Sequence, residues 1–203
     1  NPFGEIGYRP AESHSLSDEQ QIAVDAISLS LSSSTFSPFL LHGITGSGKT
    51  EVYLQATKHC LSLGKDVLVL VPEIALATQL ETHFISHFED NVAIMHSGLT
   101  AGEKYDQWSL ALGGDVKIVI GARSAVFAPL KNIGLIIVDE EHDSSYKQEN
   151  GLRYNARDLA VVRAKLNHCP VVLGSATPSI QSYHNVMSGR FSELVLKNRV
   201  NRH

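Results

Sequence analysis

The chain has 203 residues, of which 43% are hydrophobic, and it carries a formal net charge of −4 at pH 7. This length and hydrophobic content are sufficient for one large domain with a complete core. The slightly acidic balance excludes binding of nucleic acid through a global positive field, so any such contact must come from local groups.

Residues 1–15 show no hydrophobic period, and we expect a linker there, followed by a single domain over residues 16–203. Within that domain, hydrophobic residues predict an alternation of helices and strands. The predicted helices cover 17–31, 49–63, 75–88, 101–112, 155–166 and 179–187. The predicted strands cover 39–42, 67–71, 92–95, 117–120, 133–138, 171–173 and 191–196.

The predicted strands are hydrophobic throughout, as 67–71 and 133–138 illustrate, which indicates that helices bury both of their faces. Right-handed β-α-β units built from this alternation give an α/β fold with a doubly wound, mainly parallel sheet and helices on both faces. Ligands of such sheets bind at the carboxyl ends of the strands.

Residues 43–50 read G-I-T-G-S-G-K-T, a complete phosphate loop between a predicted strand and a predicted helix. Its glycines let backbone N–H groups turn toward an anion, and the helix N-terminus adds its positive end. We expect Lys49 to reach the β- and γ-phosphates and the Thr50 hydroxyl to bind Mg²⁺. The expected nucleotide-binding residues of this loop are Gly43, Thr45, Gly46, Ser47, Gly48, Lys49 and Thr50.

Two further polar segments follow predicted strands. D-E-E-H at 139–142 follows strand 133–138, where Asp139 is expected to hold Mg²⁺ and Glu140 to orient or deprotonate the attacking water. An ordinary solvent-exposed strand end is the alternative interpretation. G-S-A-T-P at 174–178 follows strand 171–173, and taken alone it is more typical of a helix cap.

These three segments, in this order and spacing, resemble motifs I, II and III of superfamily-two helicases. More narrowly, residues 16–196 resemble the PriA (primosomal protein N′) family of replication-restart helicases. The shared segments are L-H-G-I-T-G-S-G-K-T-E-V-Y, V-P-E-I-A-L, H-S-G-L, I-G-A-R-S-A-V-F-A-P, D-E-E-H-D-S-S-Y-K-Q-E and R-Y-N-A-R-D-L-A. The resemblance implies the first RecA-like motor lobe of a 3′-to-5′ ATP-dependent DNA helicase that acts at stalled forks and supports primosome assembly.

The resemblance also implies roles for individual residues. Gln20 is similar to the family's adenine-reading glutamine, although Ser17 and Gln20 also form an S-x-x-Q capping box that would explain both. His142 is implied to couple the nucleotide site to DNA by bonding toward Ser175 or Thr177. The implied catalytic set is Lys49, Asp139, Glu140, His142, Ser175 and Thr177.

DNA contacts are implied after three other strands and in an aromatic-rich loop. Pro72-Glu73, H-S-G at 96–98 and R-S at 123–124 resemble segments that bind phosphates without reading sequence. The loop after D-E-E-H combines rings and cations, as base stacking with phosphate neutralisation requires, and a surface loop whose tyrosines pack locally is the less favoured alternative. The expected DNA-binding residues are Ser97, Arg123, Ser124, Tyr146, Lys147, Arg153, Tyr154 and Arg157.

The expected cofactors are ATP and Mg²⁺, with zinc only in a downstream region of the family. The resemblance implies single-stranded and forked DNA, primosome proteins and single-strand-binding proteins as partners of a monomer. It places the arginine finger on a second motor domain, so the lobe alone is expected to be nearly inactive. Two distant cysteines, Cys60 and Cys169, and the lack of a bilayer-length hydrophobic run favour the cytoplasm and no membrane contact.

Three alternatives remain open. Another superfamily-two translocase, acting in repair or restriction, would share most of the motifs. A small-molecule kinase would use the phosphate loop but has no need of D-E-E-H or G-S-A-T-P. A catalytically silent nucleotide-sensing module would bind nucleotide without responding to DNA.

Overall fold

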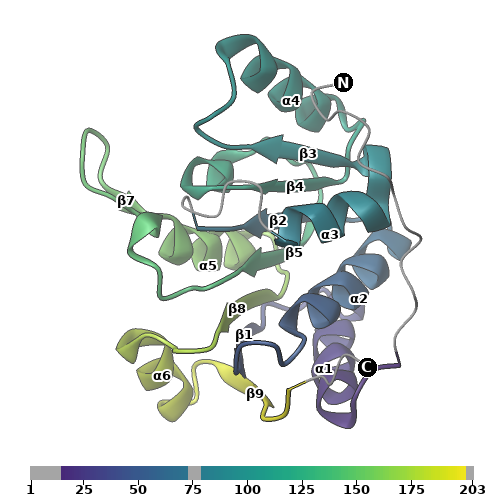
Figure 1. The fold of residues 1–203 in the computed structure, drawn as a ribbon, viewed down its shortest axis with the longest axis vertical. Helices are drawn as coiled ribbons and strands as arrows, with labels where there is room; N and C mark the ends of the chain where they lie inside the picture. The colour runs from purple at the N-terminus through teal and green to yellow at the C-terminus, as the bar shows by residue number, and fades with distance from the viewer. Residues whose placement is uncertain (1–14, 73–78, 200–203) are drawn as a thin grey trace.

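The computed structural model describes residues 15–72 and 79–199, in which helices and strands alternate along the chain (Figure 1). The strands of the main sheet are β1 (Pro38–Gly43), β2 (Asp66–Leu70), β3 (Val92–Met95), β4 (Ile118–Gly121), β5 (Ile133–Val138), β8 (Val171–Ser175) and β9 (Ser192–Leu196). The helices are α1 (Asp18–Ser32), α2 (Lys49–Ser62), α3 (Gln79–Phe88), α4 (Ala101–Gly113), α5 (Ala156–Leu166) and α6 (Ile180–Met187). Most of the predicted linker over 1–15, and the first residues of the helix predicted over 75–88, lie outside the described residues.

The main sheet has seven strands in the order β3-β4-β2-β5-β8-β1-β9, and its neighbouring strands pair in parallel. The predicted α/β fold with a doubly wound parallel sheet is therefore confirmed. Strand β8 lies between β1 and β5, with Leu40 opposite Leu173 and Ile137 opposite Val172. Strand β1 precedes the phosphate loop, β5 precedes D-E-E-H, and β8 precedes G-S-A-T-P. The carboxyl ends of these three strands consequently lie side by side.

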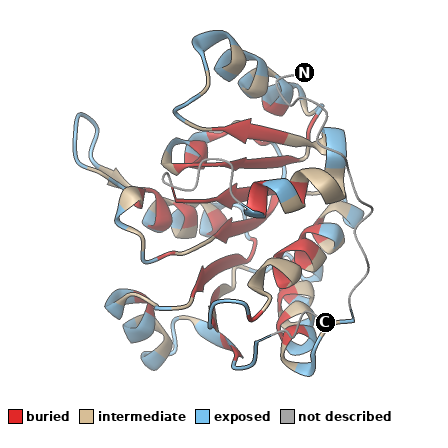
Figure 2. Ribbon diagram, viewed as in Figure 1, coloured by how far each residue is buried: buried red, intermediate tan, exposed pale blue. Residues whose placement is uncertain are grey.

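Two separate cores explain why the strands are hydrophobic at every position. Leu41 on β1 packs with Ile27 of α1 and with residues of α2 and α3, whereas the adjacent Leu40 packs with Ala160 of α5. Successive strand side chains point to opposite faces, so both faces need hydrophobic residues when helices cover both. Figure 2 shows the resulting buried sheet between helices whose outer surfaces are exposed.

The two cysteines, Cys60 and Cys169, are buried and unpaired. Burial raises the pKa of both Cys60 and Cys169 to about 12, which keeps the thiols protonated and unreactive at neutral pH. Within the described residues, no helix combines the length and the apolar character needed to cross a membrane.

A short hairpin after β5 was not predicted. It consists of β6 (Lys147–Gln148) and β7 (Tyr154–Asn155), which pair antiparallel, and it follows a single 3-10 turn at Ser144–Tyr146. The connection between the two strands projects from the body of the lobe near β7 (Figure 1). Two-residue strands carry no detectable hydrophobic period, so the pattern that predicts the main sheet cannot find them.

Candidate functional site

The phosphate loop leads directly into α2 and leaves the first turn of that helix open. Gly46 and Gly48 adopt φ values of 82° and 81°, a left-handed conformation that glycine tolerates without strain. Gly48 is the N-cap of α2 and offers no side chain, so the uncapped N–H groups of the first turn can bind an anion. The hydroxyl of Ser47 is buried without a hydrogen-bond partner in the described part of the chain, and a phosphate oxygen in the loop would supply one.

Lys49 lies between the phosphate loop and the D-E-E-H segment. Its Nζ donates a hydrogen bond to the carbonyl oxygen of Gly43 at 2.9 Å and is 3.9 Å from Oε1 of Glu140. The ammonium group therefore stands where the phosphates of a nucleotide would meet the carboxylates that follow β5.

Glu140 is held toward this position by an unusual backbone conformation. Its φ is 43°, in the left-handed region that costs a residue with a side chain about 1 kcal/mol. Its carboxylate also lies 3.6 Å from Nδ1 of His142. Strained backbone that surrounding structure maintains is concentrated at functional sites, and here it turns the Glu140 side chain toward Lys49.

Asp139 supplies a half-buried carboxylate beside the loop. Burial is the main cause that raises its pKa to about 6, with the negative charge of Glu140 adding to the effect. Its Oδ1 accepts a hydrogen bond of 3.0 Å from the hydroxyl of Tyr53 on α2. A positive ion would relieve the cost of burying this charge.

The residues expected to hold Mg²⁺ fit that ion. Thr50 and Asp139 offer a hydroxyl and a carboxylate, the hard oxygen ligands that Mg²⁺ prefers. No group of three or more His, Cys, Asp or Glu residues within 15–72 and 79–199 could hold a metal ion. A site of one or two protein ligands completed by phosphate oxygens and water is typical of Mg²⁺ in nucleotide enzymes.

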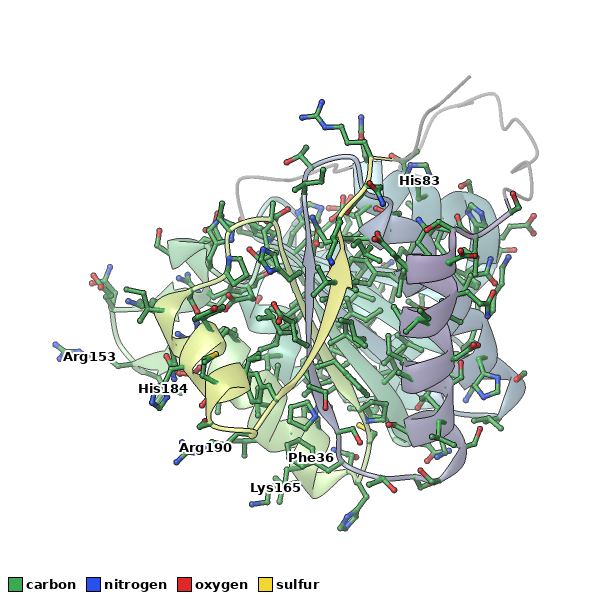
Figure 3. The ribbon with its side chains drawn as sticks, turned by 90° about the horizontal axis from the view of Figure 1, so that it is seen from below. Phe36, His83, Arg153, Lys165, His184 and Arg190 are labelled. Atoms are coloured by element: carbon green, nitrogen blue, oxygen red, sulfur yellow. The ribbon has the colours of Figure 1, made fainter. Side chains whose placement is uncertain are left out.

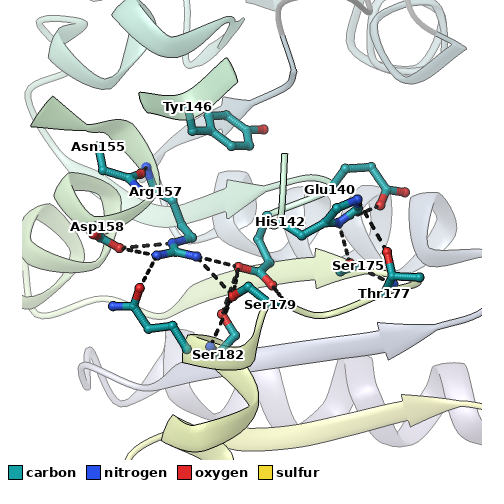
Figure 4. Close-up of polar contacts among 12 residues, drawn as sticks. Glu140, His142, Tyr146, Asn155, Arg157, Asp158, Ser175, Thr177, Ser179 and Ser182 are labelled. Atoms are coloured by element: carbon teal, nitrogen blue, oxygen red, sulfur yellow. Dashed lines mark hydrogen bonds and ion pairs between the residues drawn. The ribbon is translucent and has the colours of Figure 1, made fainter. Parts of the chain in front are cut away.

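His142, the last residue of motif II, contacts motif III, as the resemblance implies. Its Nδ1 is 2.8 Å from Oγ of Ser175, and its Nε2 is 3.4 Å from Oγ1 of Thr177 (Figure 4). The backbone also joins the two motifs, because Glu141 N–H donates to the carbonyl oxygen of Gly174 at 3.0 Å. The ends of β5 and β8 are thus connected through both main chain and side chains.

Gln20 forms the capping box and also contacts the phosphate loop. Its Oε1 accepts from the N–H of Ser17, while its Nε2 donates to the carbonyl oxygens of Ser47 and Gly48 at 3.3 and 3.2 Å. Both ends of this buried amide therefore have protein partners. Adenine recognition by Gln20 stays a prediction, and it would require the amide to exchange these partners for the base.

The expectation that Arg157 contacts DNA requires a correction. Its guanidinium is nearly buried on α5, where Nη1 donates to Oε2 of Glu141 at 3.1 Å and Nη2 donates to Oδ1 of Asp158 at 2.9 Å. The Glu141 carboxylate also accepts bonds from the N–H and hydroxyl of Ser179 and from the Ser182 hydroxyl (Figure 4). Arg157 thus balances a buried charge and ties D-E-E-H to α5 and α6.

Tyr146 also requires a correction, because its side chain is fully buried. Its hydroxyl donates a 2.6 Å hydrogen bond to the backbone carbonyl of Asp139, and burial raises the pKa of this phenol well above its ordinary value. A ring enclosed in this way cannot stack on a base. The local-packing alternative therefore describes Tyr146.

The remaining predicted DNA-binding residues gather around the hairpin. Ser97, Arg123, Ser124 and Tyr154 line one cleft of about 350 Å³, together with Lys104. Lys147 and Arg153 line a second, more open hollow that shares Tyr154. Figure 3 shows Arg153 extending away from the lobe.

The guanidinium of Arg123 anchors the segment that leads into the hairpin. It donates to the carbonyl oxygens of Ser145 and Lys147 at 3.2 and 2.6 Å. Arg123 therefore positions the hairpin beside the cleft as well as contributing charge to it.

Two residues of the site were missed at the level of sequence. Tyr53 carries a signal in hindsight, because it lies one helical turn after Lys49 and therefore on the same face of α2. Glu141 carries none, because in D-E-E-H it cannot be distinguished from Glu140 without knowing which carboxylate turns inward.

Comparison with known proteins agrees with this geometry. The model of the family described as "Type III restriction enzyme, res subunit" matches residues 13–180. The chain is 50% identical over 201 residues to the replication restart protein PriA of Bacillus subtilis, which covers 99% of this chain and 25% of that protein. It is 52% identical over 187 residues to PriA of Chlamydia pneumoniae, covering 92% of this chain and 25% of that protein.

A solved structure is similar as well. RecG bound to a three-way DNA junction matches with a TM-score of 0.70 and 25% identity, over 94% of this chain and 25% of that one. The chain therefore spans about a quarter of the length of the PriA relatives and of RecG. The similarity to PriA inferred from the motifs is confirmed, and the chain belongs to the family described as "Type III restriction enzyme, res subunit".

Proposed function

We propose that this chain is the ATP-binding motor lobe of an ATP-dependent DNA helicase that acts at stalled replication forks and supports replication restart. The observation that carries the proposal is the meeting of three motifs at adjacent strand ends, where Lys49 lies 3.9 Å from Glu140 and His142 contacts Ser175. The identity of about 50% to two PriA proteins supports the restart context. The 3′-to-5′ direction is carried over from the resemblance.

In this proposal the phosphate loop and Lys49 bind the phosphates of ATP, and Gln20 contacts adenine. Thr50 and Asp139 hold Mg²⁺, which supplies charge stabilisation for the transferring phosphoryl group. Glu140 orients the attacking water and takes its proton. His142 passes the state of this site to motif III through Ser175 and Thr177, the two hydroxyls it contacts.

DNA is assigned to the clefts around the β6–β7 hairpin. Ser97, Ser124 and Lys104 line the cleft with groups that bind phosphate, and Tyr154 offers the edge of an aromatic surface there. The Tyr154 ring is already held by Phe127 in an edge contact, with centroids 5.1 Å apart. The lobe then has separate sites for nucleotide and for a single strand.

Hydrolysis of ATP by this chain, with and without single-stranded DNA, tests the proposal. We expect binding of a fluorescent ATP analogue but negligible turnover under both conditions, because the arginine that stabilises transition-state charge is assigned to a second motor domain. Arg157 and Arg163 are committed elsewhere, to Glu141 and to the carbonyl oxygens of Val126 and Ala128. In the longer parent protein, the helicase of which we propose this lobe to be a part, Lys49→Ala and Glu140→Gln should each abolish DNA-stimulated turnover.

Lys58→Ala is a matched control, since Lys58 is an exposed lysine on the same helix as Lys49. It should leave nucleotide binding unchanged. Substantial DNA-independent turnover by the chain, lost in Lys49→Ala, would contradict the proposal and favour the kinase alternative. Normal function of the parent protein carrying Glu140→Gln would instead favour the silent nucleotide-sensing module.

Salt dependence tests the assigned DNA surface. Lys147→Ala and Arg153→Ala should each weaken binding of single-stranded DNA regardless of sequence, and each should reduce the slope of log affinity against log salt by about 0.7. Fluorescence anisotropy at several salt concentrations measures this slope. Lys165→Ala, at an exposed lysine in the last turn of α5, is the control and should leave the slope unchanged. Equal slopes for all four proteins would place the DNA elsewhere.

A translocase of repair or restriction is the nearest alternative, and the name of the matching family favours restriction. The PriA relatives favour restart more specifically, since they match 99% and 92% of the chain at 50% and 52% identity. We further propose primosome and single-strand-binding proteins as partners and the cytoplasm as the location. The two buried, unpaired thiols support a reducing compartment.

A further inference from the structure

Tyr53 connects the helix of the phosphate loop to the metal-binding carboxylate. It lies one turn after Lys49 on α2, and its side chain is 1% exposed. Its hydroxyl donates to Oδ1 of Asp139 at 3.0 Å, so one carboxylate oxygen is held by α2. The Tyr53 hydroxyl is buried, so water cannot readily replace the carboxylate as its hydrogen-bond partner.

Gly174, in motif III, leaves room for this hydroxyl because it has no side chain. A Cβ added to Gly174 would lie 1.6 Å from Oη of Tyr53 and 2.9 Å from its Cζ, well inside van der Waals contact. The same Cβ would be 3.5 Å from Oδ1 of Asp139. The glycine of G-S-A-T-P therefore provides the space through which the Tyr53 hydroxyl reaches the carboxylate.

The three motifs are consequently connected around the hydrogen bond between Tyr53 and Asp139. Gly174 is tied to motif II by the bond from Glu141 N–H to its carbonyl oxygen, and Asp139 is tied to motif I through Tyr53. If β8 moved relative to α2, Gly174 would move relative to the Tyr53 hydroxyl. This movement would disturb the hydrogen bond from Tyr53 to Oδ1 of Asp139.

We propose that Tyr53 is a positioning residue, which fixes the Asp139 carboxylate for Mg²⁺ binding, and that Gly174 is required because it accommodates the Tyr53 hydroxyl. The inference rests on the proposed function in one respect, that Asp139 is the Mg²⁺ carboxylate. Tyr53 touches neither nucleotide nor metal in this role. It acts by holding one oxygen of Asp139 so that the carboxylate keeps a single orientation.

The test is the Mg²⁺ dependence of binding of a fluorescent ATP analogue to the 203-residue chain. Tyr53→Phe removes the hydroxyl and keeps the ring, and it should raise the Mg²⁺ concentration at half-saturation about tenfold or more, as is typical when a partner of a metal ligand is lost. Binding in excess chelator should stay the same. A merely structural tyrosine would lower the melting temperature without moving the Mg²⁺ midpoint of the folded protein.

Gly174→Ala and the double variant test the steric part. The added methyl should displace the hydroxyl and shift the Mg²⁺ midpoint at least as far as Tyr53→Phe does. In the Tyr53→Phe background the nearest ring atom is 2.9 Å away instead of 1.6 Å, so the ring still has to shift but by less, and no hydroxyl remains to be displaced from Asp139. The double variant should therefore have the midpoint of Tyr53→Phe alone.

Two controls match these changes. Gly102→Ala is on α4, where an added Cβ meets nothing within 4 Å, and Tyr105→Phe is at a 72% exposed tyrosine on the same helix. Neither should move the midpoint. An unchanged midpoint in Tyr53→Phe, or additive shifts in the double variant, would overturn the positioning role while leaving the proposed function intact. A wild-type chain that binds no nucleotide at any Mg²⁺ concentration would contradict the proposed function and this role together.

Discussion

Replacing Arg157 with methionine is expected to lower the free energy of unfolding by about 3 kcal/mol at pH 7.5, because it leaves the buried Glu141 carboxylate without its positive partner. The Glu141 side chain is 0% exposed and the Arg157 side chain 10% exposed, so water cannot replace the lost interaction. Ser179 and Ser182 continue to donate to the carboxylate, which limits the loss but does not neutralise the charge. Urea denaturation followed by circular dichroism measures the change.

Asp158→Asn is the matched control, since Asp158 is bonded to the same guanidinium but is 51% exposed. Surface ion pairs contribute little, so this change should cost less than about 1 kcal/mol. A second comparison adds Glu141→Gln to Arg157→Met. The double variant should be more stable than the sum of the two single losses predicts, because the charge that Arg157 balanced is also gone. Equal losses in the free energy of unfolding for Arg157→Met and Asp158→Asn would show that the buried Arg157–Glu141 pair does not dominate the contribution of Arg157 to stability.

Replacing Asp139 with asparagine should have the opposite effect and stabilise the lobe, while abolishing ATP hydrolysis by the proposed helicase. The pKa of Asp139 rises from its ordinary value of 3.8 to about 6, chiefly through burial. At pH 8 the ionised carboxylate therefore costs the folded state about 3 kcal/mol. Asparagine has nearly the same shape and can still accept the Tyr53 hydrogen bond, but it carries no charge.

The sign of the pH dependence follows from where the proton is bound. The unfolded chain loses the Asp139 proton near pH 3.8, whereas the folded chain loses it near pH 6. Between these values the folded state binds more protons, so wild-type stability falls as pH rises through this window. The advantage of Asp139→Asn should thus be largest at pH 8, smaller at pH 5, and smallest at pH 4, where about a fifth of it remains.

Urea midpoints at these three pH values test the prediction. Asp106→Asn, at an exposed aspartate on α4, should change stability by less than about 0.5 kcal/mol throughout. A gain for Asp139→Asn that stays constant from pH 8 to pH 4 would contradict the buried-charge explanation. A gain that falls as the pH is lowered would show that the Asp139 carboxylate lowers the stability of the lobe and is retained for its function.

The sheet could be predicted because each of its strands carries a strong local signal. Continuous hydrophobic runs such as 133–138 leave no choice other than burial on both faces, and the structure places β5 at those residues. The main motifs could be located for the same reason, since each follows such a run. Strand order required contacts between distant segments, which a local pattern does not encode.

The residues that were assigned incorrectly are those whose role depends on which way a side chain turns. Tyr146 and Arg157 have the composition of a DNA-binding loop, yet the hydroxyl of Tyr146 bonds to the Asp139 backbone and the guanidinium of Arg157 bonds to Glu141. Composition alone cannot separate a surface cation from one that balances a buried acid. Tyr53 was missed because its function requires the space at Gly174, and that space exists only after β8 is placed beside β5.

The position of β1 in the sheet has a consequence for the order of folding. Strand β1 pairs with β8 on one side and with β9 on the other. Residues 38–43 therefore receive both of their neighbouring strands from residues 171–196. Closing so long a loop costs entropy that later contacts must offset, and pairings of this kind form slowly. During synthesis residues 38–43 emerge before residues 171–196, so β1 lacks both of its strand neighbours until those later residues are available. The pairing of β1 therefore predicts that the phosphate loop gains its flanking strands late in the folding of the sheet.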